Sequence, residues 1–404
     1  MRSLYSLISI LFLYLLAYNI FNIFCTQIPV PAKSPPETNT FLTKNVAGKT
    51  KPLSSPPLEQ SSKQEISSKK KPLLLEDKNS VMPENRNTVY SPKRRKNQRR
   101  ALEILRSSED VSKNFESRVS NFFFDANSSS CELRFFMIWI SSLDSFTNRS
   151  IFSIESLFKA HPNGCLVIVS RSMDTKKGAR ILTPFAEKGL KVTAISPDFN
   201  YLFGKTAARA WYNSLKHGKI NPGRISFGQN LSNLVRLAVL YHFGGVYLDT
   251  DVIVLKSFRK LRNVIGAQAV ERVTRKWSRL NNAVMIFKRG HPLLVKFIEE
   301  FARTFDGDKW GHNGPYLVSR VAMRASGDVG CDFTVLPPEA LYPVGWREIR
   351  GLFEGPKNSS HSKWIGGKVR EIRRQSFAVH LWNKQSKVLE VEKGSIVHRL
   401  MFEL

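Results

Sequence analysis

Two aspartates, Asp249 and Asp251, are separated by one residue and stand between the diglycine Gly244-Gly245 and the apolar run Val252-Ile253-Val254-Leu255. Carboxylates two residues apart lie on the same side of an extended chain. At about 5 Å and an effective dielectric near 20 they repel each other by roughly 3 kcal/mol, so a bound cation is needed to offset that cost. Hard oxygen ligands suit Mg²⁺ or Mn²⁺, and such an ion can also neutralise a diphosphate.

The segment from residue 230 to the diglycine has the periodicity of a helix. Leucine, valine and alanine occupy both of its sides, which predicts a helix that is buried nearly all round. Asn233 and Arg236 interrupt this apolar surface at a spacing of i and i+3. A buried guanidinium needs an anionic or strongly accepting partner, which is either a structural ion pair or a ligand. The diglycine ends the helix, and Val246-Tyr247-Leu248 predicts a strand that leads into the aspartates.

Strands and helices alternate upstream of this helix. Apolar runs predict strands at 135–140, 166–169 and 191–195, and the segments at 151–158 and 175–188 predict helices between them. Such connections are right-handed and produce a parallel sheet with helices on both faces. Ligands bind at the carboxyl ends of the strands in these sheets. The sequence therefore predicts an α/β fold with a mostly parallel sheet in a domain at 131–404.

The first 25 residues are predicted to be a signal anchor that spans a membrane. Residues 4–25 carry no charge, and as a helix they would rise roughly 33 Å, enough to cross the hydrocarbon core. Bulky residues stand where a signal-peptide cleavage site needs small ones, which favours an uncleaved anchor over a cleaved signal peptide. In either case we expect the rest of the chain to be lumenal.

Residues 26–130 are predicted to form a disordered basic stem, because ten prolines between positions 29 and 92 oppose regular structure. The stem contains Lys93-Arg94-Arg95-Lys96, followed by Arg99 and Arg100. This cluster is typical of a nucleic-acid patch. Entry into the secretory route argues against that role and favours a solvated run or a retention or processing signal.

The composition excludes two broad classes of protein. The 404 residues are 42% hydrophobic, too many for a wholly disordered chain, and four cysteines are too few for a disulfide scaffold. The formal net charge of +29 indicates an anionic partner such as nucleic acid, an anionic membrane surface or a phosphorylated small molecule. Three cysteines in the predicted lumenal part leave the pairing of one disulfide open. Sequons at Asn127, Asn148 and Asn358 predict glycosylation, whereas the sequon at Asn230 adjoins the buried helix and is expected to be unused.

The chain resembles the alpha-1,4-glycosyltransferase family, the lactosylceramide 4-alpha-galactosyltransferase-like proteins with an Asp-x-Asp sugar-binding region, and it looks closest to plant members. The resemblance covers about 135–387 and is densest at 230–258, at Asn281-Asn282-Ala283-Val284 and at Trp310-Gly311-His312-Asn313-Gly314-Pro315. It implies a GT-A type nucleotide-sugar-binding fold in a single-pass type II Golgi membrane protein with a lumenal catalytic domain. The implied activity is retaining transfer of a hexose, often galactose, from a UDP-sugar to a glycan or glycolipid acceptor.

The resemblance also assigns roles to individual residues. It implies that Asp249 and Asp251 hold Mn²⁺ (or Mg²⁺) and the donor diphosphate, and that Arg236 contacts the donor. Metal at Asp251 and the cationic Arg236 would stabilise the leaving diphosphate, which makes these two the predicted catalytic residues. Asn282 is placed at a donor contact. GT-A enzymes often complete the metal shell with a C-terminal histidine, and His380 is the candidate, with a buried core histidine as the alternative.

One residue departs from the family pattern. The family commonly reads Ser-Asp-x-x-Arg in this helix, whereas the chain reads Ser232-Asn233-Leu234-Val235-Arg236. Asn233 is the predicted donor-sugar contact, and the lost carboxylate leaves the identity of the sugar open. Two alternative functions stay open as well: a catalytically weak lumenal protein that binds nucleotide sugars, favoured by Asn233, and a basic nucleic-acid-binding protein. We expect no nucleic-acid partner, because lumenal glycosylation would exclude one. The acceptor has no portable sequence signature.

Overall fold

The structure is a computed structural model that describes residues 92–106, 114–124 and 131–403. Within these ranges no helix has both the length and the apolar character needed to cross a membrane. The predicted anchor at 1–25 and the larger part of the predicted stem lie outside the described residues.

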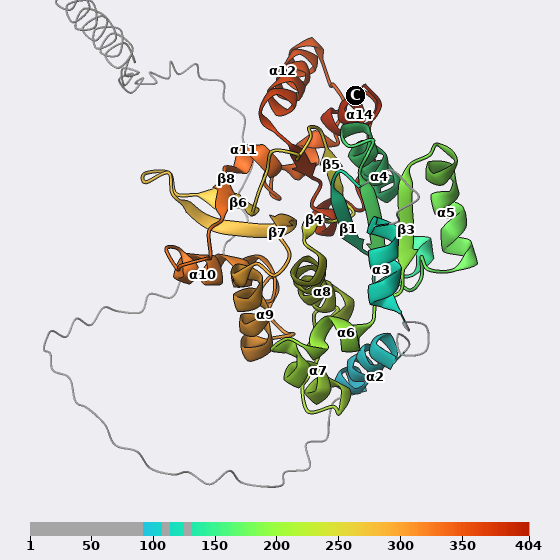
Figure 1. Ribbon diagram of the computed structural model, residues 1–404. Coiled ribbons are helices and arrows are strands. Elements are labelled where there is room, and N and C mark those ends of the chain that lie inside the picture. Colours follow the sequence, from blue (N-terminus) through green and yellow to red (C-terminus); the bar gives the residue numbers. More distant parts are fainter. Residues whose placement is uncertain (1–91, 107–113, 125–130, 404) are drawn as a thin grey trace, which may run out of the picture. The chain divides into compact units, whose positions relative to one another are not determined.

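A seven-stranded sheet runs through the domain in the order β3-β2-β1-β4-β7-β6-β8 (Figure 1). Four neighbouring pairs are parallel, and the two pairs that involve β7 are antiparallel. The predicted α/β fold with a mostly parallel sheet is therefore confirmed. The strands are β1 (Arg134–Ile138), β2 (Cys165–Val169), β3 (Lys191–Ile195), β4 (Gly245–Leu248), β6 (Val264–Val270), β7 (Trp277–Phe287) and β8 (Thr334–Leu336).

Two further strands form a small antiparallel sheet that matters for the site. Strand β5 (Val252–Val254) follows β4 after a short turn and pairs with β9 (Ala378–His380). This pairing joins segments that are more than a hundred residues apart in the chain.

The helices cover both faces of the large sheet, which separates two apolar layers. Alternate side chains of β1 enter different layers, since Phe136 belongs to one buried cluster and Phe135 to the other. The helices on the β1 Phe136 side include α6 (Phe199–Gly204), α7 (Ala208–Lys216), α8 (Phe227–Phe243), α9 (Pro292–Thr304) and α10 (Pro315–Ala325). Those on the opposite side include α4 (Asn148–Ala160), α5 (Lys176–Glu187), α11 (Pro338–Leu341), α12 (Ser359–Gln375) and α14 (Ile396–Phe402).

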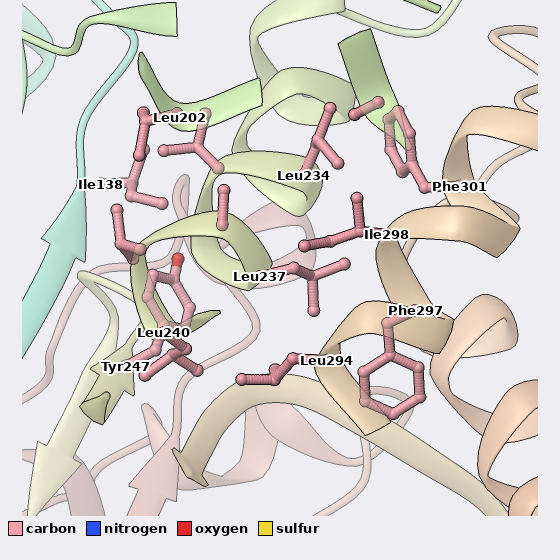
Figure 2. Packing of buried hydrophobic residues seen from close by; sticks show 14 of the residues in the cluster. Ile138, Leu202, Leu234, Leu237, Leu240, Tyr247, Leu294, Phe297, Ile298 and Phe301 are labelled. Atoms are coloured by element: carbon pink, nitrogen blue, oxygen red, sulfur yellow. The ribbon is translucent and has the colours of Figure 1, made fainter. Parts of the chain in front are cut away.

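Helix α8 is the centre of the first layer. Figure 2 shows Leu234 and Leu237 of α8 facing Ile298 and Phe301 of α9. Twelve of the seventeen residues of α8 are buried, which confirms the prediction of a helix buried nearly all round. The helix ends at Gly244, whose φ of +63° is in the left-handed region that glycine adopts without strain.

The predicted stem is wrong over its described part, which is helical and folded. Helix α2 (Pro92–Arg106) buries Ala101, and α3 (Phe115–Phe124) buries three side chains at helical spacing, Phe115, Val119 and Phe123. Prolines and charges dominate the composition of 26–130 as a whole and conceal these short apolar stripes. The folded domain therefore begins before the predicted boundary at 131.

The structure pairs the cysteines that the sequence left open. Cys131 and Cys165 form a disulfide that ties the segment before β1 to the start of β2. Cys331 is buried and carries a free thiol.

Candidate active site

The aspartate pair lies in the turn between β4 and β5, at the carboxyl end of a central strand of the large sheet. Strand β5 then pairs with β9, which sets His380 opposite Val252, next to the turn. Asp249, Asp251 and His380 each offer one ligand atom, and these atoms lie within 4.8 Å of one another. The fold thus brings together the three residues that were predicted as metal ligands. That they bind an ion stays a prediction.

Asp251 is held on both of its oxygens. His380 Nε2 lies 3.3 Å from Asp251 Oδ1, and the backbone N–H of Asn383 donates to Oδ2 at 2.7 Å. Burial acts to raise the pKa of Asp251, but attraction to His380 and the hydrogen bonds from His380 and from backbone N–H groups together outweigh it and hold this pKa below its usual value. Burial acts to lower the pKa of His380, but attraction to Asp251 and Asp249 and the hydrogen bond to Asp251 together raise it. The Nδ1 atom of His380 is buried without a hydrogen-bond partner.

Asp249 is the more accessible of the two carboxylates, with 26% of its side chain exposed. Its Oδ1 lies 3.0 Å from Arg236 Nη1 and accepts a 2.5 Å hydrogen bond from the hydroxyl of Tyr247. Burial raises the pKa of Asp249 more than the charge of Arg236 lowers it. Two contacts therefore orient one oxygen of Asp249.

Arg236 lies behind Asp249, with only 7% of its side chain exposed. Its three guanidinium nitrogens donate to Ser232 O, Ser232 Oγ and Asn282 O, and its guanidinium covers the ring of Tyr247 at 4.4 Å. The structural ion pair that the sequence left open is present, and it positions Asp249. A contact between Arg236 and the donor stays a prediction.

Asn233 and Asn282 form a buried amide pair beside Arg236. Asn282 Nδ2 donates to Asn233 Oδ1 at 2.9 Å. A Cβ atom on Gly314 would lie 2.8 Å from the same oxygen, so only glycine allows this turn to approach the pair. Asn233 Nδ2 has no hydrogen-bond partner among the described residues, so it is free to donate to an incoming group. A contact between Asn233 and the donor sugar stays a prediction.

Sequence reasoning missed two tyrosines that support the site. Tyr247 was recognised only as a strand residue, although its position two residues before Asp249 places it on the same side of the chain. Tyr342 is buried and contacts β7 at two points: its hydroxyl donates to Asn281 O and accepts from Val284 N–H, both at 3.3 Å. It comes from a distant segment, and no local pattern could have identified it.

The predicted glycosylation sites differ in their surroundings. Asn148, at the start of α4, and Asn358, which caps α12, are exposed. Asn127 lies outside the described residues. Asn230 is buried and accepts a hydrogen bond from Asn313, which agrees with the expectation that its sequon is unused.

Two family models match different parts of the chain. The model described as "Glycosyltransferase sugar-binding region containing DXD motif" matches residues 147–271, which include Asp249 and Asp251. The model described as "Alpha 1,4-glycosyltransferase conserved region" matches residues 286–403, which include His380.

Individual relatives agree with these matches. Lactosylceramide 4-alpha-galactosyltransferase of Rattus norvegicus is 33% identical over 253 residues, which cover 60% of this chain and 65% of the relative. The protein of the same name from Pongo pygmaeus is 33% identical over 49% of this chain and 85% of its own length. An uncharacterized protein of Arabidopsis thaliana is 30% identical over 67% of this chain and 41% of that protein. The chain thus spans about 65% of the rat relative's length.

Proposed function

The chain belongs to the alpha-1,4-glycosyltransferase family, and we propose that it is a retaining, metal-assisted hexosyltransferase that uses UDP-galactose. The observation that carries this proposal is the grouping of Asp249, Asp251 and His380 at the carboxyl end of β4. The relatives named lactosylceramide 4-alpha-galactosyltransferase support galactose as the sugar and a β-galactoside-ended glycan or glycolipid as the acceptor. The GT-A type of fold is part of the proposal.

The donor set fits a hard divalent cation. Two carboxylates and an imidazole converge, and the charges of Arg236 and His380 offset the repulsion between the carboxylates in the structure. A bound Mn²⁺ or Mg²⁺ would supply Lewis-acid stabilisation of the departing diphosphate. Asn383 fixes the carboxylate of Asp251, while Arg236 and Tyr247 fix that of Asp249, so that both ligands are preorganised.

The acidic residues of the described part favour one mechanism for retention of the anomeric configuration. In it the acceptor attacks the sugar on the face from which the diphosphate leaves, without a covalent intermediate on the protein. In the described part of the chain, the carboxylates that are almost fully buried are those of Asp251 and Glu300. Glu300 accepts hydrogen bonds from Arg303, Arg320 and Arg324, which neutralise it as a nucleophile. Asp251 is occupied as a predicted metal ligand. A covalent sugar intermediate on a carboxylate therefore receives no support, and the leaving diphosphate is left to guide the acceptor.

A lumenal Golgi location, with the predicted anchor at residues 1–25 in the membrane, is part of the same proposal. The disulfide between Cys131 and Cys165 supports it, because disulfides persist in oxidising compartments and are rare in the cytosol. The exposed sequon asparagines Asn148 and Asn358 are compatible with lumenal glycosylation.

One second function is favoured by a specific observation, namely a lumenal protein that binds nucleotide sugars with little turnover. Asn233 replaces the aspartate of the family pattern, so that the amide pair with Asn282 carries no charge beside the sugar. An uncharged pair can bind a sugar and still stabilise a cationic transition state less well.

Hydrolysis and transfer assays on the purified full chain separate the two functions. With a panel of UDP- and GDP-sugars and Mn²⁺, the expected result is turnover of UDP-galactose that stops when a chelator is added. Binding of UDP-sugars with no hydrolysis and no transfer to methyl β-lactoside would favour the binding protein. No binding of any nucleotide sugar would contradict both.

A further inference from the structure

A turn between α9 and α10 holds an exposed tryptophan, Trp310, with 42% of its surface accessible. Hydrogen bonds hold the turn at two residues that follow Trp310, His312 and Asn313. Arg320 Nη1 donates to His312 O at 2.9 Å, and Asn313 Nδ2 donates to Asn230 Oδ1 at 3.0 Å. Gly311, with φ of +71°, adopts a conformation that other residues rarely adopt. A large apolar ring is thus presented to solvent from a rigid support, which is typical of a binding contact.

The ring lies beside the proposed donor site. Lys384 Nζ lies 3.0 Å from the centroid of the Trp310 ring, and the preceding residue, Asn383, donates to the carboxylate of Asp251. The two contacts, one extended lysine side chain and one backbone step together place the ring centroid within about 17 Å of that carboxylate. At the other end of the same turn, Gly314 packs against Asn233. The turn therefore forms a wall that extends from Asn233 to Lys384.

The position of Lys384 indicates what the ring can bind. An aromatic face is electronegative and attracts a cation or any other electropositive group. The C–H groups on one face of a pyranose are such a group, and in a β-galactoside the hydrogens on C3, C4 and C5 share a face. The ammonium of Lys384 lies over the Trp310 ring, where the C–H face of a sugar would stack. Burial at this position lowers the pKa of Lys384.

We propose that Trp310 is the stacking platform for the acceptor sugar, and that Lys384 covers the platform until the acceptor displaces it. The inference rests on the proposed function and adds the residue that selects the acceptor. It assigns to Trp310 a preference for pyranosides with an uninterrupted C–H face, and it explains why the turn that carries Trp310 is anchored both to α8, through Asn230, and to α10, through Arg320.

Saturation-transfer NMR on the full chain with the diamagnetic ion Mg²⁺, UDP and methyl β-lactoside tests the platform. We expect transfer to the galactose H3, H4 and H5 protons in the native chain. In Trp310→Ala the affinity for the lactoside should fall about tenfold, while Trp310→Phe retains most of it because a ring face remains. Trp364→Ala is the matched control, since Trp364 on α12 is also exposed, at 52%, and it should match the native chain.

The cover is tested with Lys384→Ala, which removes the cation that competes for the ring. We expect the affinity for methyl β-lactoside to rise about threefold. A fall in affinity in this variant, an unchanged signal in Trp310→Ala, or no transfer in the native chain would overturn the inference. UDP binding with Mg²⁺ is measured on the same samples. Failure of UDP binding counts against the proposed function, whereas intact UDP binding with a failed lactoside result counts against the platform alone.

Discussion

At the scale of single residues, the site is a set of preorganised polar contacts around two carboxylates. Asp251 is fixed by His380 and by the Asn383 backbone, and Asp249 is fixed by Arg236 and Tyr247. Arg236 is a positioning residue in this arrangement. Asn233 has an uncommitted donor, since its oxygen accepts from Asn282 while its Nδ2 faces no partner among the described residues.

Substitution of Asn233 tests its predicted role in reading the donor sugar. Asn233→Ala should lower kcat/KM, because Asn282 and a sugar hydroxyl lose their partner. The expected loss of transition-state stabilisation is roughly 1–3 kcal/mol. Asn233→Asp can still accept from Asn282 but loses the N–H donor, so the ranking of donor sugars should change while the fold is retained. Kinetics of both variants across the UDP-sugar panel measure this. Unchanged selectivity together with an unchanged rate would mean that Asn233 only fills space.

The spacing of residues anticipated much of the site. The aspartate pair, the i and i+3 polar positions on an apolar helix and the histidine after a short strand all converge in the structure, as the motif and the family resemblance implied. Tyr342 and Lys384 escaped prediction, because they reach the site through loops and α13 (Asn383–Ser386), and their side-chain directions depend on tertiary packing.

At the scale of elements, the pairing of β5 with β9 and the turn before β4 decide where the site residues lie. The hydrophobic periods of β1, β2, β3 and α8 were sufficient to predict these elements. The sequence analysis missed helices α2 and α3. A single apolar stripe in a segment rich in proline and charge is weak evidence for a folded helix unless a packing partner for the stripe is known. The partner that covers α2 lies far away in the sequence, where Asn97 and Gln98 bond to Gly223 and Gly218.

The turn from α8 into β4 predicts a strong effect of one glycine. Gly245 has φ of +113°, and a Cβ atom there would lie 2.4 Å from Arg134 O of β1. Gly245→Ala should therefore lower the free energy of unfolding by more than about 2 kcal/mol, because it combines backbone strain with displacement of a paired strand. Gly189→Ala is a useful control, since Gly189 also has positive φ but its Cβ would meet nothing within 4 Å. Urea unfolding curves compare the two. Equal losses of stability would mean that strain alone acts.

The anchoring of α9 and α10 through Glu300 predicts a pH dependence of stability. Burial opposes the charge of Glu300, but hydrogen bonds from Arg320, Arg303 and Arg324 outweigh it and lower the pKa from 4.5 to about 2. The folded state therefore binds the proton more weakly than the unfolded state. The stabilisation, on the order of 3 kcal/mol, is complete above pH 4.5 and is lost as the pH falls toward 2.

Comparison with Glu300→Gln isolates this contribution. Unfolding free energies of the native chain and the variant should converge between pH 4.5 and pH 2, because the native chain alone loses the ionised carboxylate. Parallel pH profiles for the two proteins would contradict the assigned role of the arginine cluster.

At the scale of the whole molecule, the proposed lumenal catalytic domain follows a predicted anchor at residues 1–25. The large positive charge is consistent with a diphosphate donor, although among the described residues the basic groups in contact with the aspartates are Arg236 and His380. Composition predicted an anionic partner and left its class open. It could not predict the site, since most basic residues in the described part of the chain lie on the surface.

The topology makes a prediction of its own. If the domain is lumenal, Asn148 and Asn358 are exposed acceptors, and glycosidase treatment of the full chain from a eukaryotic host should increase its gel mobility. The double variant Asn148→Gln, Asn358→Gln should show a smaller shift, with any remainder attributable to Asn127. The chain should also stay in the membrane fraction after a carbonate wash. Unchanged mobility, or recovery in the soluble fraction, would contradict this topology.

The central claim is that Asp249, Asp251 and His380 bind a divalent ion that the nucleotide donor requires. Titration calorimetry of UDP into the full chain tests it most directly, with Mn²⁺, with a chelator, and in Asp251→Asn, which keeps an acceptor for the Asn383 N–H. The account predicts measurable binding with Mn²⁺ and at least about tenfold weaker binding in the other two cases. Asp328→Asn, an exposed aspartate paired with Lys296, should bind like the native chain. Equal UDP affinity in chelator, or in Asp251→Asn, would contradict the claim.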